Sequence, residues 1–248
     1  IVRVLEERSP ETIRYTFVDL TPENVHEAIS SLQTWARKRG YDVAGSTEQT
    51  WIRRDLEVQI TFVTADFFDV VTDYEGPSFD AVVSQSVLDL LPIPKAVRGL
   101  RSVLCEAGLL YLPLHFDGVT AFEPSIEPSL DADIERLYHE SMSDVGQEGG
   151  REGAVSGRRL LAHLQSRGDQ IVAAGSSDWV VVPRDGAYPG DEAYFLHHIL
   201  HFIEDELSGH PDLADTRLAD WVQTRRAQIE AGELVYLTHQ LDVLARMS

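Results

Sequence analysis

The chain of 248 residues has one cysteine, two lysines and no long apolar run. The single thiol, Cys105, excludes internal disulfides and thiolate zinc clusters, and it fits a reducing compartment. No stretch reaches the ~18 apolar residues that a membrane-spanning helix needs. The opening residues IVRVLEERSP also lack the basic, apolar and small-residue order of a secretory signal. We therefore expect a cytoplasmic protein with no membrane association.

Positive charge is scarce as well. The 21 basic residues stand against 41 acidic ones, which gives a net charge of −20 and an isoelectric point near 4.7. A polyanion would be repelled, so we expect no nucleic-acid partner. An acidic surface that is poor in lysine suits concentrated salt. This pattern favours a halophilic source over the alternative, an ordinary acidic protein.

The first half of the chain alternates β-rich runs with helical segments. Strands are predicted over 13–20, 58–64, 79–84 and 109–116, and helices over about 22–39 and 93–104. The strands are nearly continuous in apolar residues, as in a parallel sheet covered on both faces. The sequence therefore predicts an α/β fold with a doubly wound, mostly parallel sheet.

The second half departs from this alternation. Residues 118–156 contain Pro124, Pro128 and the soft stretch GQEGGREG, which makes them a candidate lid or insertion. After a helix over 157–167, the runs QIVAAG and WVVVP are too close for a parallel crossover, so we expect an antiparallel hairpin. Helical additions are predicted over about 190–208, 211–231 and 233–246.

Acidic residues end two of the predicted strands. In a doubly wound sheet, ligands bind at the carboxyl ends of the strands. Asp19 is placed there to accept hydrogen bonds from both hydroxyls of a ribose, and Asp66 to accept one from an adenine amine while Phe67 lies against the ring. Aspartate also ends strands as a turn former or helix cap, so this alternative stays open.

With these residues in place, the chain resembles class I S-adenosylmethionine-dependent methyltransferases over most of its length. TFVDLTPENV is similar to the family segment with the ribose-binding acid, VTADFFD to the segment with the adenine-binding acid, and FDAVVSQSVLDLLP to a further family segment. The closing QIVAAGSSDWVVVP is similar to the reversed last strand of that family. The resemblance implies S-adenosylmethionine as cofactor, bound by Asp19, Leu20, Ala65, Asp66, Phe67, Ser84 and Gln85.

One family feature, the G-x-G-x-G loop between the first strand and first helix, is missing from these residues. IVRVLEER has the pattern of a helix tail. We therefore expect a glycine-rich turn ~5–20 residues upstream of Ile1, and a sheet that lacks its central first strand here. The expected organisation is a single domain over 1–248, with a cofactor-binding half at 1–117, a lid at 118–156, a helix and closing hairpin at 157–182, and C-terminal helices at 183–248.

The sequence identifies few catalytic residues, and the implied chemistry needs few. The sulfonium of the donor carries its own leaving group, so the enzyme mainly orients the acceptor. A base is needed only when the acceptor must lose a proton. His115, just beyond the fourth strand, is the candidate for that role, with a generic surface histidine as the alternative, and Tyr111 and Tyr138 are less decidable.

A histidine-rich segment offers a possible metal site. His197 and His201 are four residues apart on one helical face, and Glu204 follows one turn later. Histidines are also common at the edge of an apolar helix face, and no H-E-x-x-H order is present. We therefore expect no metal.

The predicted function is methyl transfer from S-adenosylmethionine to an unidentified small-molecule acceptor. Nucleic acid is disfavoured by the charge, and lipid by the lack of a basic amphipathic anchor. Two alternatives stay open, namely a nucleotide-dependent oxidoreductase and a catalytically silent methyltransferase-fold binding protein.

Overall fold

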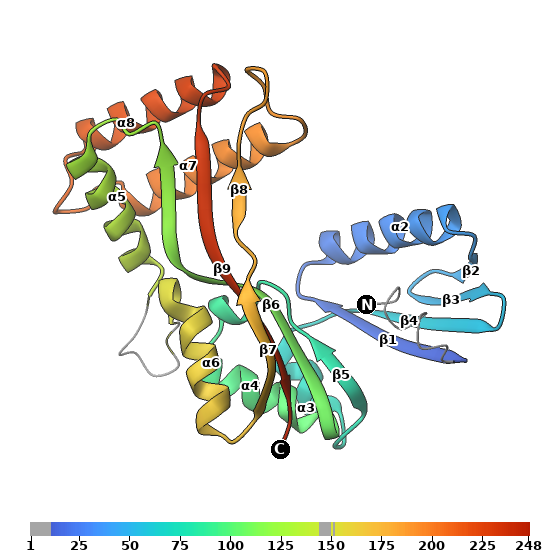
Figure 1. Ribbon diagram of the computed structural model, residues 1–248. Coiled ribbons are helices and arrows are strands. Elements are labelled where there is room, and N and C mark those ends of the chain that lie inside the picture. The colour runs from blue at the N-terminus through green and yellow to red at the C-terminus, as the bar shows by residue number, and fades with distance from the viewer. Residues whose placement is uncertain (1–10, 144–149, 151) are drawn as a thin grey trace. The chain divides into compact units, whose positions relative to one another are not determined.

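The computed structural model describes residues 11–143, 150 and 152–248. The chain divides into two compact units, Ile1–Glu75 and Gly76–Ser248 (Figure 1). The predicted helix tail at the start, and most of the GQEGGREG stretch, lie outside the described residues. This division differs from the boundary expected at 117, and the single-domain organisation stays a prediction.

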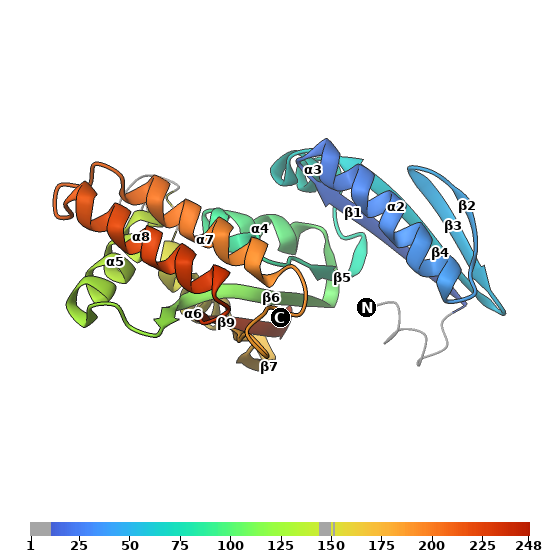
Figure 2. The same ribbon diagram turned by 90° about the horizontal axis from the view of Figure 1, so that it is seen from above.

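The first unit is a four-stranded sheet with one long helix. Its elements are β1 (Thr12–Asp19), α2 (Pro22–Lys38), β2 (Asp42–Gly45), β3 (Glu48–Arg53), β4 (Leu56–Thr64) and α3 (Phe67–Asp73). The strand order is β1-β4-β3-β2, with β1 and β4 parallel and the other pairs antiparallel. Helix α2 runs along β1, β4 and β2 (Figure 2). Pro22 at its first turn and Arg37 and Lys38 at its last turn are the residues that helix ends favour.

The core of this unit lies between α2 and the sheet. Trp51, Val58 and Ala36 are almost completely buried there. The indole N–H of Trp51 donates to Oε1 of Gln49 at 2.8 Å, which satisfies the one polar atom of the ring. The sequence analysis missed strands β2 and β3, because few of their residues follow an alternating apolar pattern. Their conformation is decided by the pairing of β3 with β4 and of β2 with β3.

The second unit contains the other sheet and most of the helices. Its strands are β5 (Phe79–Val83), β6 (Leu104–Glu123), β7 (Gln170–Ser176), β8 (Trp179–Val181) and β9 (Val235–Arg246). Its helices are α4 (Ile93–Ser102), α5 (Pro128–Ser141), α6 (Ser156–Ser166), α7 (Glu192–Leu207) and α8 (Asp215–Glu230), with short 3-10 turns η1 (Leu88–Leu90) and η2 (Gly153–Val155). None of the helices in the described part is long and apolar enough to cross a bilayer.

The second sheet is built on two long strands. Its order is β5-β6-β9-β7, where β5 and β6 are parallel and β9 runs antiparallel to β6 and β7. One half of β6 and β9 lies beside β5 and β7, and the other half is surrounded by α5, α7 and α8 (Figure 1). The α/β class and the reversed C-terminal strand are therefore confirmed. Among the described residues, no strand pairs with both β1 and β5.

Two predicted elements of the C-terminal half are wrong. The predicted helix over 233–246 is replaced by β9 (Val235–Arg246), which lies between β6 on one side and β7 and β8 on the other. Tyr236, Thr238 and Gln240, at alternate positions of β9, are buried. The hairpin over 170–182 does not form either. β7 and β8 both pair with β9, from Gln170 opposite Arg246 to Val181 opposite Tyr236, because β9 is long enough to accept both. The reversed strand of the fold is thus 235–246.

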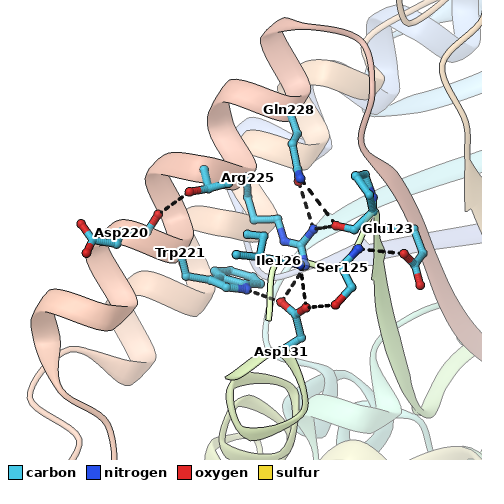
Figure 3. Close-up of polar contacts among 10 residues, drawn as sticks. Glu123, Ser125, Ile126, Asp131, Asp220, Trp221, Arg225 and Gln228 are labelled. Atoms are coloured by element: carbon cyan, nitrogen blue, oxygen red, sulfur yellow. Dashed lines mark hydrogen bonds and ion pairs between the residues drawn. The ribbon is translucent and has the colours of Figure 1, made fainter. Parts of the chain in front are cut away.

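A buried polar network fixes α5 and α8 to the segment that leaves β6 (Figure 3). Arg225 on α8 is fully buried and donates to Asp131 Oδ1 at 2.8 Å and to the carbonyl oxygen of Pro124 at 2.6 Å. Asp131 also accepts from Trp221 Nε1 at 2.6 Å and from Ser125 Oγ at 2.7 Å. This network fixes the position of α5 within the unit, and therefore also the positions of the other side chains that α5 carries.

Candidate functional site

The carboxyl ends of β1 and β4 meet at one edge of the first sheet. The two strands are parallel neighbours, and Asp19 lies directly opposite Thr64. The backbone N–H of Ala65 donates to the carbonyl oxygen of Asp19 at 3.1 Å. Asp19 and the Ala65-Asp66-Phe67 segment, which are far apart in the sequence, are therefore brought together as the strand pattern predicted.

The carboxylate of Asp19 also organises the turn into α2. Oδ1 accepts from the backbone N–H of Thr21 at 2.8 Å, and Asn24 Nδ2 lies 3.2 Å from Oδ1 and 3.3 Å from Oδ2. The turn-forming alternative is thus part of the structure. An ionised carboxylate has about four lone-pair sites, so these bonds leave acceptor capacity for a ligand. The neighbouring Leu20 is 66% exposed, which leaves an apolar side chain open beside this acid.

Asp66 is the N-cap of α3. Its Oδ1 accepts from the backbone N–H of Phe68 at 2.7 Å, and its side chain is exposed. Phe67 is half-buried, with its ring edge-on to Phe68 at a centroid distance of 5.1 Å. The helix-cap alternative is therefore also present, but the cap occupies only one of the two carboxylate oxygens.

Ser84 and Gln85 follow β5 in the second unit. The backbone N–H of Ser84 donates to the carbonyl oxygen of Tyr111 at 3.1 Å, and that of Ser86 to Pro113 at 3.2 Å. Ser86 has a φ of +52°, which turns the chain away from the strand. The side chain of Gln85 is exposed. How these residues relate to Asp19 and Asp66 of the first unit stays a prediction.

The second unit contains a cavity of about 180 Å³, which we call the aromatic-acidic pocket. It is lined by residues from η1, β6, α5, η2 and α7, namely Asp89, Leu90, Phe116, Tyr138, Ser141, Met142, Gly153, Phe202 and Glu206. Asp89 and Leu90 follow Ser84 and Gln85 by only a few residues, so the segment after β5 leads directly into this pocket. The candidate lid predicted over 118–156 includes four of these residues, but sequence analysis gave none of the lining residues a binding role, because they come from five separate elements.

Two residues that line the pocket, Asp89 and Tyr138, have pKa values that burial raises. Burial raises the pKa of Asp89 above its ordinary value, although backbone N–H groups of η1 oppose the shift. Its Oδ1 is buried and accepts no hydrogen bond from the described residues. Burial, together with the charge of Glu206, raises the pKa of Tyr138 to about 12. Tyr138 is therefore neutral at physiological pH and lies within the field of the Glu206 carboxylate.

His115, the predicted base candidate, is fully buried in β6. Burial lowers its pKa to about 4, against the opposing charge of Asp242. Neither ring nitrogen is hydrogen-bonded to a described residue. It precedes Phe116 but is not among the residues that line the aromatic-acidic pocket. Its catalytic role stays a prediction, and the ring is neutral at pH 7.

A second, more open cavity of about 520 Å³ lies along α5 and η2. Its lining includes Glu135 and His139, which sequence analysis also missed. Burial and the charge of Asp131 raise the pKa of Glu135 to about 7. Burial lowers the pKa of His139, whose Nε2 lies 3.1 Å from Thr120 Oγ1.

The histidine face of α7 makes ion pairs with α8. His197 Nε2 lies 3.0 Å from Glu230, and Glu204 pairs with Arg226 at 2.6 Å. Two of the three residues considered for a metal therefore contact other partners. Within residues 11–143, 150 and 152–248, no group of three histidine, cysteine or acidic side chains is placed to hold a metal ion.

Comparison with known proteins gave matches only among solved structures. No family model and no curated protein sequence matches the chain. A protein of Bacillus halodurans assigned as a methyltransferase is 12% identical, with 99% of this chain and 97% of that chain covered and a TM-score of 0.48. An S-adenosylmethionine-dependent methyltransferase of Methanosarcina mazei is 11% identical, with 98% and 96% covered and a TM-score of 0.44.

A third match is more distant. It is a Haemonchus contortus phosphoethanolamine N-methyltransferase in complex with S-adenosylhomocysteine, which is 10% identical over 100% of this chain and 52% of that chain, with a TM-score of 0.36. All three are named as methyltransferases. At this level of likeness, the function has to be inferred from the residues of the chain itself.

Proposed function

We propose that this protein transfers a methyl group from S-adenosylmethionine to a small-molecule acceptor. The observation that carries the proposal is the pair of acids at the carboxyl ends of neighbouring parallel strands. Asp19 lies directly opposite Thr64, so Asp66 is two residues beyond the position opposite Asp19. Ligands of open α/β sheets bind at this edge.

The side chains at this edge fit an adenosine moiety. Asp19 keeps acceptor capacity for two ribose hydroxyls, since its bonds to Thr21 and Asn24 use only part of its lone pairs. Asp66 keeps one oxygen for an exocyclic amine, and Phe67 supplies a half-buried ring. The cofactor-binding role of Ser84 and Gln85, which follow β5, stays a prediction from the sequence.

This reaction requires the protein to orient the acceptor more than to act as a general acid or base. When bound, the sulfonium donor supplies a methyl group and leaves as a neutral thioether. The aromatic-acidic pocket is proposed to hold the acceptor, because the segment after β5 connects Ser84 to Asp89 and Leu90 on its wall. Holding the acceptor in line with the methyl group contributes up to ~7–11 kcal/mol to lowering the barrier.

Calorimetric titration of the full-length protein with S-adenosylhomocysteine tests the proposal. Asp19→Ala should weaken binding by about 2–3 kcal/mol, because two ribose hydroxyls lose a charged acceptor. Asp66→Ala should weaken it less, since only one amine is affected. Asp19→Asn keeps a side-chain acceptor for Thr21 and separates loss of charge from loss of the turn. Asp42→Ala, at an exposed acid on β2, is the matched control.

Unchanged affinity in Asp19→Ala would refute the assignment of this site. Parallel titration with NAD separates the two alternative functions. Heat of binding with NAD and none with S-adenosylhomocysteine would favour an oxidoreductase. That function would give no explanation for Asp66 or for the reversed strand β9. No heat with either ligand would favour a silent binding protein.

A further inference from the structure

We infer that the aromatic-acidic pocket binds a small organic cation, with an ammonium group held by carboxylates and aromatic rings. The inference rests on the proposed function, because it names the chemical class of the methyl acceptor. The ammonium nitrogen has no lone pair, so the methyl group would go to another, nucleophilic atom of the bound cation. It concerns only the second unit, whose pocket residues come from η1, β6, α5, η2 and α7.

The charge of the pocket lining favours a cation. Among the described residues, the lining includes two acids, Asp89 and Glu206, and no lysine, arginine or histidine. Asp89 Oδ1 is shielded from solvent and has no hydrogen-bond partner in the described part of the chain. That oxygen has no surface open to the pocket, so the attraction of a cationic ligand comes from the charge of the two acids, which would repel an anionic ligand.

The aromatic rings of the pocket favour the same class of ligand. Phe116, Tyr138 and Phe202 all line it, and the faces of such rings attract ammonium groups, most strongly where water is excluded. The hydroxyl of Tyr138 stays protonated at neutral pH, so this ring adds no charge of its own. Acidic and aromatic side chains around one cavity thus favour positive charge combined with apolar surface.

The size and access of the pocket limit the ligand. A dry cavity of about 150 Å³ accepts a molecule as large as benzene. The 180 Å³ here therefore fits a cation of roughly six to eight heavy atoms. Leu90 and Phe202 are 61% and 52% exposed, so two apolar lining residues are open to solvent and available to an incoming ligand. Larger acceptors would have to extend beyond the pocket.

The test compares two ligands of the same shape, choline and its neutral isostere 3,3-dimethylbutan-1-ol. Binding to the full-length protein is followed by nuclear magnetic resonance or calorimetry, with and without S-adenosylhomocysteine. Choline should bind at least about tenfold more tightly than the isostere. Asp89→Asn and Glu206→Gln should each weaken choline by about fivefold or more and leave the isostere unchanged. Asp205→Asn, the same charge change on an exposed neighbour in α7, should have no effect.

Equal affinity for the two ligands, or equal losses in Asp89→Asn and Asp205→Asn, would overturn the inference. The failure of the proposed function is distinguishable from this outcome. Choline binding without any S-adenosylhomocysteine binding would leave the cation site standing and remove the methyl-donor site. S-adenosylhomocysteine binding with no preference for choline would do the reverse. Aromatic substitution, Phe116→Leu, should reduce choline affinity more than isostere affinity.

Discussion

The buried pair of Arg225 and Asp131 gives a sharp test of how the helical part of the second unit is held together. We expect Asp131→Asn to destabilise the protein far more than its size suggests. Arg225 is fully buried and its guanidinium lies over the rings of Trp221 and Phe122, at 5.0 and 5.4 Å from their centroids. Without the Asp131 charge, its remaining partners are the neutral oxygens of Pro124 and Gln228.

The magnitude follows from the geometry of the carboxylate. Oδ1 of Asp131 accepts from Trp221 and Arg225, and Oδ2 accepts from Ser125 and Ile126. The side-chain amide of asparagine has only one acceptor oxygen. In Asp131→Asn, its NH₂ group would therefore face either the donors that now bind Oδ1 or those that now bind Oδ2. Removing one partner of a buried ion pair destabilises by about 3–5 kcal/mol. The double variant Asp131→Leu with Arg225→Met should recover part of that loss, because it removes both charges of the pair but leaves the donors of Trp221, Ser125 and Ile126 without this acceptor.

Urea unfolding followed by circular dichroism measures these changes. The matched control is the pair of Arg217 and Glu127, which joins the same helical region at 2.8 Å but is half exposed on both sides. Glu127→Gln should change the free energy of unfolding far less than Asp131→Asn does, because solvent screens an exposed pair. A loss below about 1 kcal/mol for Asp131→Asn, or a double variant worse than either single one, would refute the reasoning.

The pH dependence of this network has a definite sign. Burial alone would raise the pKa of Asp131, but the bonds from Ser125, Trp221 and Arg225 outweigh it and lower the pKa below the ordinary 3.8. The stabilisation is therefore present above pH 3.8 and is lost as the pH falls through the lower pKa of the folded state. Asp131→Asn should remove this acid-dependent part of the unfolding profile.

Three further predictions concern other features. Because the pKa of Glu135 is raised from 4.5 to about 7, its ionisation destabilises the fold as pH rises through that interval, so Glu135→Gln should raise the melting temperature at pH 8 and not at pH 4. Gly232 and Gly209 both have positive φ, but only at Gly232 would a Cβ meet backbone, 2.1 Å from the oxygen of Gly186. Gly232→Ala should therefore cost more than the ~1–2 kcal/mol expected for Gly209→Ala, as measured by urea unfolding. If the 41 acids reflect halophily, the melting temperature should rise steadily with KCl into the molar range, whereas a flat profile would indicate an ordinary acidic protein.

Local signals in the sequence determined much of the secondary structure. The proline at the start of α2 and the cations at its end predicted its position, and α4, α6 and α7 were likewise expected close to their observed bounds. The parallel pairing of β1 with β4 also followed from the sequence, through two apolar strands separated by a helix. That pairing is what placed Asp19 beside the Ala65-Asp66 segment.

Other elements were decided by tertiary contacts. The sequence of β9 contains helix formers such as Leu237 and Ala245, yet it forms a strand because β6 and β7 both supply backbone partners to it. β7 and β8 both pair with β9 and not with each other. The spacing between them carries no information on a strand about sixty residues away. Pairing with distant strands overrides local propensity in such cases.

The candidate site divides in the same way. Asp19 and Asp66 were found from the sequence because each follows a recognisable strand, and strand ends have a defined place in an α/β sheet. The aromatic-acidic pocket was not, since Asp89, Phe116, Tyr138 and Glu206 come from four elements and none has a distinctive local pattern. The raised pKa of Asp89 likewise depends on burial by residues distant in sequence. The sequence alone determined where the strand-end acids lie along the chain, and only tertiary packing gathered separate side chains into a cavity.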